Sequence, residues 1–254
     1  MDNAHLEQLR QVVDTAPQNV EARLALLHAL IAAAAWQEAT EVGIPLLPLE
    51  SPPAVVHGLM GLAYGQQQQW TEAIAQYQQA VHAQPDEAEV FFNLGTLLAQ
   101  QGDYAAAQTA LEKAVALRAD WAEAHYNLGT VLLRQERYSE AIAALKYATE
   151  QRETYPEAHF NRGNAHAMKG LDREGRLDYY ELDCATTAYK TAIQQRPGYT
   201  AALYNLGMLY SRMKTSEGLR VWDQYLEATK DTPAEETWRM RAREYKHDLQ
   251  DRLS

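Results

Sequence analysis

The sequence predicts an all-α fold built from stacked antiparallel helix hairpins, an α-solenoid. The first observation behind this prediction is an internal repeat, because residues 88–121 and 122–155 form one 34-residue unit that occurs twice without a gap. A fixed period of this length is typical of stacked helix hairpins. Identical residues at matching positions of the two copies include Asn93/Asn127, Leu94/Leu128, Gly95/Gly129, Thr96/Thr130, Leu98/Leu132, Tyr104/Tyr138, Ala107/Ala141, Leu111/Leu145 and Ala114/Ala148.

The second observation is a glycine inside each expected first helix of a hairpin. Glycine in a helix costs about 1 kcal/mol relative to alanine, so its recurrence indicates that the second helix approaches closely there. The glycines of the first helices are Gly61, Gly95, Gly129, Gly163 and Gly207. The small residues of the second helices that are expected to contact them are Ala73, Ala107, Ala141 and Ala185. The large residues expected to fill the space around it are Tyr64, Leu98, Leu132, Tyr77, Leu111, Leu145 and Tyr189.

The composition excludes several classes of protein. The 254 residues are 46% hydrophobic and 22% charged, which is typical of a soluble globular chain. The net charge of -11 argues against nucleic acid as the main ligand, because phosphate binding needs clustered Lys and Arg, and it favours basic or neutral partners. No apolar run approaches the ~18 residues of a membrane span, and the amino end lacks the pattern of a secretory signal.

The single cysteine, Cys184, permits no intrachain disulfide and indicates a reducing compartment, so we expect a cytoplasmic location. It also lacks a motif that would mark it as a nucleophile. The Ala-rich helices and the run from Gln66 to Gln69 suggest a bacterial source.

The elements can be assigned in order along the chain. Apolar residues with helical spacing, Leu6, Leu9, Val12 and Val13, precede Pro17 and predict an amino-terminal capping helix within residues 1–19. The 34-residue period then places hairpins at 20–53, 54–87, 88–121, 122–155, 156–199 and 200–233, followed by a carboxy-terminal capping helix at 234–254.

The first hairpin is degenerate. Leu27 replaces the glycine of the first helix, and Gly43 replaces the large residue of the second helix. Pro45 and Pro48 interrupt that second helix, which is therefore expected to be short or kinked.

The later units depart from the repeat in other ways. The fifth hairpin contains about ten extra residues, within 171–181, which form either a solvated loop or lengthened helix ends. In the sixth, the second helix near Glu217 to Thr229 carries Trp222 and is shifted by about two residues. The last helix has an apolar stripe of Trp238, Ala242, Tyr245 and Leu249 and a polar face of Arg239, Arg241, Arg243, Lys246 and Asp248.

The spacing within the units carries a family resemblance. In residues 54–87 the pattern G-x2-Y, A-x3-Y-x2-A and a terminal proline is formed by Gly61, Tyr64, Ala73, Tyr77, Ala80 and Pro85. This pattern resembles the tetratricopeptide repeat family. The resemblance implies a right-handed superhelix in which the first helices line a concave groove where ligands usually lie. It also implies that the second, fifth, sixth, ninth, twelfth and thirteenth positions of each unit face that groove.

Those positions contain a recurring pair of an aromatic residue and an asparagine. The pairs are Phe92 and Asn93, Tyr126 and Asn127, Phe160 and Asn161, and Tyr204 and Asn205. An exposed Asn has low helix propensity, whereas a row of carboxamides suits the backbone of an extended peptide and aromatic faces suit its side chains. The pattern resembles the asparagine ladders of family members that hold extended polypeptides. Arg134, Asn164, Met208 and Arg212 extend the same predicted peptide-binding surface.

Two alternatives apply to this face. The asparagines can be inherited repeat consensus, with each aromatic ring only shielding the neighbouring hairpin. At the amino-terminal end the corresponding positions are apolar, and they either receive a hydrophobic segment or lie under the kinked helix or the cap. These positions are Leu24, Ala25, His28, Ile31, Val55, Leu59 and Leu62.

The charged and histidine positions of the repeats also allow more than one interpretation. The basic clamp by which some family members bind chaperone tails is absent, because no Lys or Arg occupies the fifth or sixth position. The acidic column Glu89, Glu123 and Glu157 either favours a basic partner segment or complements the helix dipoles. His57, His125 and His159 lie on different hairpins without metal-motif spacing, so they and His166 are expected to be packing residues rather than metal ligands.

These observations predict a non-enzymatic adaptor or scaffold that binds a protein or peptide partner in its groove. No catalytic residue, cofactor or metal site is expected, because the chain has neither a nucleotide-binding glycine loop nor a nucleophile elbow. One alternative is an assembly factor or self-associating scaffold that uses the convex face, the caps or the insertion with Tyr179 and Tyr180. Such a scaffold could form a homo-oligomer. A second alternative, from another class, is the regulatory subunit of an enzyme.

Overall fold

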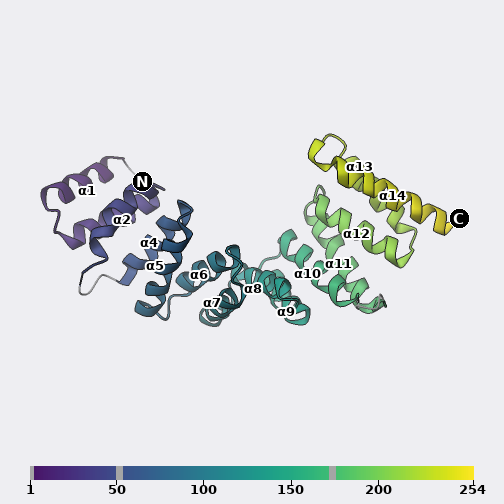
Figure 1. Cartoon of the computed structure of the whole chain (residues 1–254), viewed down its shortest axis with the longest axis horizontal. Helices are drawn as coiled ribbons and strands as arrows, with labels where there is room; N and C mark the ends of the chain where they lie inside the picture. The colour runs from purple at the N-terminus through teal and green to yellow at the C-terminus, as the bar shows by residue number, and fades with distance from the viewer. Residues whose placement is uncertain (1–2, 50–53, 172–175) are drawn as a thin grey trace. The chain divides into compact units, whose positions relative to one another are not determined.

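The computed structural model describes residues 3–49, 54–171 and 176–254. Within these ranges every regular element is a helix, and Leu171 and Leu177 form an isolated antiparallel bridge. The contacts divide the chain into two compact units, residues 1–119 and 120–254. The predicted all-α fold of stacked antiparallel hairpins is therefore confirmed (Figure 1).

The first unit contains the amino-terminal cap and three hairpins in its described part. Helix α1 packs on α2, and the hairpins are formed by α2 with α3, α4 with α5, and α6 with α7. The bounds are α1 Asn3–Thr15, α2 Val20–Ala32, α3 Trp36–Gly43, the 3-10 helix η1 Ile44–Leu46, α4 Ala54–Gln66, α5 Trp70–Ala83, α6 Ala88–Gln100 and α7 Tyr104–Leu117.

The second unit contains three further hairpins and the carboxy-terminal cap in its described part. The hairpins are α8 with α9, α10 with α11, and α12 with α13, and α14 packs on α13 and α12. The bounds are α8 Ala122–Arg134, α9 Tyr138–Gln151, α10 Pro156–Lys169, α11 Tyr179–Gln195, α12 Thr200–Met213, α13 Glu217–Ala228, the 3-10 helix η2 Pro233–Glu235 and α14 Glu236–Leu253.

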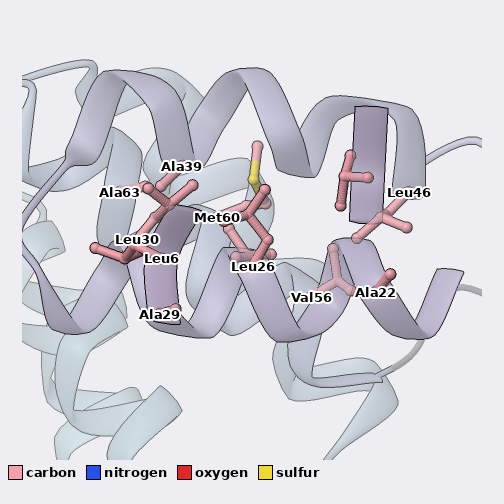
Figure 2. Close-up of a cluster of buried hydrophobic side chains, with 12 residues drawn as sticks. Leu6, Ala22, Leu26, Ala29, Leu30, Ala39, Leu46, Val56, Met60 and Ala63 are labelled. Atoms are coloured by element: carbon pink, nitrogen blue, oxygen red, sulfur yellow. The ribbon is translucent and has the colours of Figure 1, made fainter. Parts of the chain in front are cut away.

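The degenerate first hairpin has the short second helix that its prolines predict. Helix α3 is eight residues long and passes directly into η1, which has Pro45 in its first turn. A side chain at Gly43 would overlap the sulfur of Met60, so the absence of a side chain there lets α4 approach. Leu26 and Leu30 of α2 meet Leu6, Leu46 and Met60 in one buried cluster (Figure 2). Residues 50–53, the end of this predicted unit, lie outside the described residues.

The repeated glycine makes the close contact that was predicted, but with a different partner. A Cβ at Gly129 would lie 2.6 Å from Leu145 Cγ, and one at Gly163 would lie 2.6 Å from Tyr189 Cε1. Ala141 contributes its carbonyl oxygen to the Gly129 contact rather than its methyl group. The glycine thus accommodates the large residue of the second helix, and the expectation that alanine meets it is corrected. In the sixth hairpin Trp222 takes this place against Gly207.

The turn between the two helices of most hairpins contains a residue in the left-handed conformation. These residues are Ala34, Gln68, Gly102, Glu136 and Lys214, with φ values of 56°, 60°, 85°, 59° and 55°. Left-handed backbone costs a non-glycine residue about 1 kcal/mol. Of these five residues only Gly102 is a glycine, the residue type that indicates this geometry from sequence. The other four adopt it because they occupy the same position of the repeat.

The insertion of the fifth hairpin lengthens the helix that follows it. Helix α11 has 17 residues and α9 has 14, so part of the extra length extends the helix. Leu171 and Leu177 form the antiparallel bridge, and the carboxylate of Asp178 caps α11 by accepting from the amides of Tyr180 and Glu181. Residues 172–175 of the predicted insertion lie outside the described residues.

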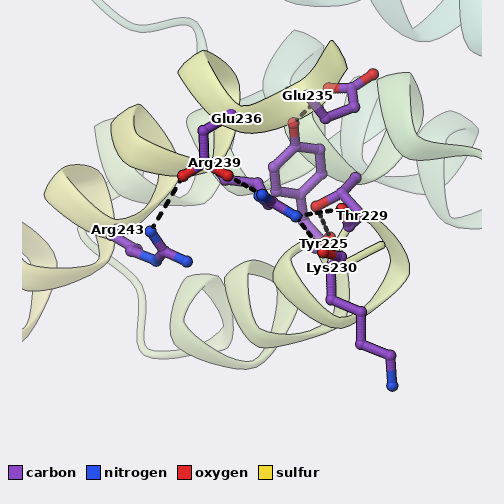
Figure 3. Close-up of polar contacts among 7 residues, drawn as sticks. All are labelled: Tyr225, Thr229, Lys230, Glu235, Glu236, Arg239 and Arg243. Carbon is purple, nitrogen blue, oxygen red and sulfur yellow. Dashed lines mark hydrogen bonds and ion pairs between the residues drawn. The ribbon is translucent and has the colours of Figure 1, made fainter. Parts of the chain in front are cut away.

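The last helix differs from its predicted polar and apolar faces in two residues. Ala242 and Leu249 are buried as expected, but Trp238 is 45% exposed. Arg239, predicted on the solvent face, turns back instead: it donates to the carbonyl oxygen of Thr229 at 2.7 Å and to that of Lys230, and it pairs with Glu236 (Figure 3). Carbonyls at a helix end lack partners within the helix, so this contact caps α13.

Candidate functional site

The predicted binding residues lie on the first helices of four hairpins. Phe92 and Asn93 are on α6 in the first unit, and the others are on α8, α10 and α12 in the second. Arg134 and Arg212 are exposed, whereas the aromatic residues, the asparagines and Met208 are half-buried. The five asparagine amides are therefore partly accessible to a ligand.

The aromatic residues of this surface pack mainly within their own hairpins. The ring of Tyr126 lies 5.0 Å from that of Tyr155, and Phe160 lies 5.1 Å from Tyr199. Burial raises the pKa of the Tyr126 and Tyr204 hydroxyls above the ordinary value. The rings of Tyr126 and Phe160 therefore stabilise their own hairpins, whereas the shielding alternative placed each ring against the neighbouring hairpin, and both residues remain half-buried.

Two of the asparagines link one first helix to the preceding one. Asn161 Nδ2 on α10 donates to Thr130 Oγ1 on α8 at 3.1 Å. Asn205 Nδ2 on α12 donates to Asn164 Oδ1 on α10 at 2.8 Å, and Asn164 Oδ1 also accepts from Tyr189 Oη at 2.8 Å. Because a carboxamide has two donor hydrogens and two acceptor lone pairs, each of these bonds leaves hydrogen-bonding capacity for a ligand.

Five of the predicted residues meet around one cavity between α10 and α12. The cavity has a volume of about 350 Å³, within the usual range for ligand sites. The predicted residues in its wall are Asn164, Tyr204, Asn205, Met208 and Arg212. Met168 and Leu171 also line it, together with Ala167, Tyr189 and Leu209, so the insertion begins at the edge of this cavity. Asn127 and Asn161 do not line it.

In the first unit, Asn93 lines a separate cavity of about 370 Å³. Its wall includes Trp70 and Tyr77 of α5 and Thr96 and Gln100 of α6. Three of the apolar groove positions near the amino terminus, Leu24, Ile31 and Leu59, are partly buried. They pack against the buried cluster of the first unit shown in Figure 2.

The acidic column is paired within the chain. Glu89 bonds to Arg118 at 3.2 Å and Glu123 bonds to Arg152 at 3.1 Å. The third pair is Glu157 with Arg196. The guanidinium groups of Arg152 and Arg196 also lie over the rings of Tyr155 and Tyr199, at 4.6 and 4.7 Å. Ion pairs within the chain are therefore a third role of this acidic column, beside attraction of a basic partner and interaction with the helix dipoles.

The histidines of the fourth position each contact a neighbouring side chain. His57 Nδ1 lies 2.8 Å from Gln76 Oε1, and the His125 ring stacks on Tyr147 with centroids 5.0 Å apart. His159 is buried beside Arg162. Over the part of the chain that the structure describes, no group of three or more His, Cys, Asp and Glu side chains could hold a metal ion.

Burial, and then the adjacent Arg162 cation, lower the pKa of His159 to about 4. The unfolded value is about 6.5, so the folded protein loses stability as the pH falls from about 6.5 toward 4. We expect His159→Gln to remove about 1 to 2 kcal/mol of this acid sensitivity between pH 8 and pH 5. Urea unfolding of the unmodified chain and of His159→Gln at pH 8 and pH 5 gives the four free energies of unfolding. If both proteins lose the same free energy between pH 8 and pH 5, the expectation is contradicted.

Sequence reasoning missed a buried ion cluster at the insertion. Glu181 is 6% exposed, and its oxygens bond to His166 Nδ1 and Lys169 Nζ, each at 2.6 Å. Burial opposes ionisation of Glu181, but the hydrogen bonds from Lys169 and His166 lower its pKa below the ordinary value. His166 was expected to be a packing residue only. No periodic signal identifies this cluster, because the insertion that carries Glu181 lies outside the repeat.

Comparison with known families supports the repeat assignment. A tetratricopeptide repeat model matches residues 92–156 and 126–183, and a TPR repeat model matches residues 61–102. The chain is a tetratricopeptide repeat (TPR) protein. TPR repeats are typically non-enzymatic protein-interaction modules.

Solved structures agree with the TPR fold. A crystal structure of MamA is 24% identical, covers 72% of this chain and 95% of its own, and has a TM-score of 0.64. YrrB, described as "a TPR protein with an unusual peptide-binding site", is 24% identical over 71% of this chain and 88% of its own, with a TM-score of 0.61. The carboxy-terminal part of a TPR repeat-containing protein from Cytophaga hutchinsonii is 15% identical over 90% of this chain and 91% of its own, with a TM-score of 0.70.

Comparison with curated proteins gave no match. In the described ranges of this TPR protein, none of the helices combines the length and the apolar character that crossing a bilayer requires.

Proposed function

We propose that this TPR protein is a non-enzymatic adaptor or scaffold that binds an extended polypeptide segment on the first-helix face of its hairpins. The observation that carries the proposal is the cavity between α10 and α12, because five residues predicted to bind a peptide line it together. The peptide-binding site named for YrrB is consistent with this use of the fold. The net charge and the single cysteine favour a basic or neutral protein partner in a bacterial cytoplasm.

The second unit supplies the chemistry that such a segment needs. Asn127, Asn161 and Asn205 are half-buried carboxamides on successive first helices, which suit the alternating donors and acceptors of a peptide backbone. The cavity between α10 and α12 accepts one apolar side chain against Met168, Leu171 and Met208.

The test uses peptides selected from a random library on the full chain. We expect Asn127→Ala/Asn161→Ala to weaken their binding by about tenfold, since each lost hydrogen bond is worth about 0.5 to 1.5 kcal/mol. The matched control is Gln151→Ala/Gln194→Ala, which removes two exposed carboxamides from the second helices α9 and α11. Fluorescence anisotropy gives the Kd values, and circular dichroism checks that both variants fold.

A second candidate is a scaffold that self-associates or binds through the insertion. The observation that favours it is the exposure of Tyr179 and Tyr180, which are 62% and 75% exposed at the start of α11. If the selected peptides bind Asn127→Ala/Asn161→Ala with an unchanged Kd but fail to bind Tyr179→Ser/Tyr180→Ser, the second candidate replaces the first.

A further inference from the structure

A second cavity of the carboxy-terminal unit has walls of a different kind. It has a volume of about 260 Å³ and lies where the start of α12 meets α13 and η2. The rings of Tyr204, Tyr225 and Trp238 and the carboxylate of Glu235 form its walls, and Thr200 and Asn205 lie at its edge.

The ring of Tyr204 stands at a steep angle to each of the other two. Tyr204 and Tyr225 have centroids 5.4 Å apart and an interplanar angle of 66°, and Tyr204 and Trp238 have centroids 5.2 Å apart at 80°. Trp238 is accessible at the opening, since it is 45% exposed, whereas Tyr225 is buried at the base. The face of an aromatic ring carries negative charge density and attracts cations. Rings on several sides of one small cavity therefore favour a positively charged guest.

Glu235 adds a full negative charge to this wall. Its Oε2 accepts a hydrogen bond from Tyr225 Oη at 2.9 Å, which holds the carboxylate against the aromatic base (Figure 3). Its Oε1 has no hydrogen-bond partner in the described part of the chain and can accept from a ligand.

The arginines nearby do not neutralise the cavity from within. Arg239 is directed to the carbonyl oxygen of Thr229 and to the carboxylate of Glu236. The Arg241 guanidinium lies 5.1 Å from the centroid of the Trp238 ring, and Arg241 is not part of the cavity wall. Among the described residues that line the cavity, Glu235 is the charged one.

We propose that this cavity binds the alkylammonium head of a cationic ligand. The volume is below the ~300 to 1,000 Å³ of sites for larger ligands, so it suits a single cationic head. Two sources share this chemistry: a lysine side chain of a polypeptide and a small quaternary amine. Tyr204 and Asn205 also line the cavity between α10 and α12, so a lysine beside a segment bound there would reach the aromatic walls. The cation site does not depend on the proposed polypeptide binding.

The experiment titrates the full chain with choline and with its neutral isostere 3,3-dimethylbutan-1-ol, following the Trp indole N–H signals by NMR. We expect choline to bind at least about tenfold more tightly than the isostere, and Trp238→Ala and Glu235→Gln each to weaken choline binding by about fivefold to tenfold. The matched control is Glu236→Gln, which removes a neighbouring carboxylate that pairs with Arg239 and Arg243 outside the cavity.

A parallel titration with N-acetyl-lysine N-methylamide distinguishes the sources. Binding of the lysine derivative identifies a polypeptide source, and binding of choline alone identifies a free quaternary amine. The proposal is overturned if neither cation binds, if choline and its isostere bind equally, or if both cavity variants bind choline as the unmodified chain does. None of these readouts involves Asn127 or Asn161, so they are separate from the test of polypeptide binding.

Discussion

Trp222→Ala is expected to lower the free energy of unfolding of the carboxy-terminal hairpin by about 3 to 5 kcal/mol, the usual cost of deleting a large buried aromatic side chain. Trp222 is completely buried, and its ring stacks on Tyr245 with centroids 5.8 Å apart. Its Nε1 donates to Ser211 Oγ at 3.0 Å. The substitution thus removes the contacts that join α12, α13 and α14 and leaves a cavity opposite Gly207.

The matched control is Trp238→Ala, because Trp238 is also a tryptophan of this unit but is 45% exposed. Its truncation is expected to cost only about 1 kcal/mol, from the lost contact with Tyr204 and the lost cation–π contact with Arg241. Urea unfolding followed by circular dichroism gives the two free energies, and hydrogen exchange locates the loss in α12–α14. Equal effects of the two substitutions would show that Trp222 is not the centre of this core.

Gly129→Ala is expected to lower the free energy of unfolding and Gly58→Ala to raise it, so that the two variants differ by about 2 kcal/mol. Both glycines lie inside first helices, where alanine is intrinsically favoured by about 1 kcal/mol. At Gly129 the added Cβ would lie 2.6 Å from Leu145 Cγ and 3.3 Å from the carbonyl oxygen of Ala141. Overpacking of this kind typically costs about 1 to 3 kcal/mol, so the net effect there is destabilising.

At Gly58 the nearest atom to an added Cβ is Val90 Cγ2 at 3.7 Å, an ordinary van der Waals contact. Gly58→Ala therefore keeps its propensity gain. Thermal or urea unfolding of the two single variants measures both signs. If Gly129→Ala stabilises the protein, the contact between its first helix and Leu145 is looser than the structure shows.

The packing of the hairpins could be predicted because it depends on the sizes of residues at fixed spacing. The glycine of each first helix and the large residue of each second helix recur with the period, so Gly129 and Leu145 indicate the same contact as Gly95 and Leu111. The identity of the partner was wrong for Ala141, because the sequence gives the size of a residue but not the direction of its Cβ.

The polar contacts were mostly beyond sequence reasoning. Arg239 was assigned to solvent by its place on the helix, yet it reaches the unpaired carbonyl oxygens at the end of α13. Asn164 accepts hydrogen bonds from Tyr189 and Asn205, which are 25 and 41 residues away along the chain. The approach of Glu235 to Tyr225 depends on the single turn η2, which begins at the last residue of the sixth repeat.

By itself the sequence determined that the chain is a series of stacked helix hairpins and which face of each hairpin forms the core, because both depend on the spacing of apolar and small residues within a unit. Only the tertiary structure decided which polar side chains face one another, which cavities they enclose and which charges are already paired. Those depend on contacts between helices distant in sequence and on turns outside the period, and no spacing within one unit encodes them.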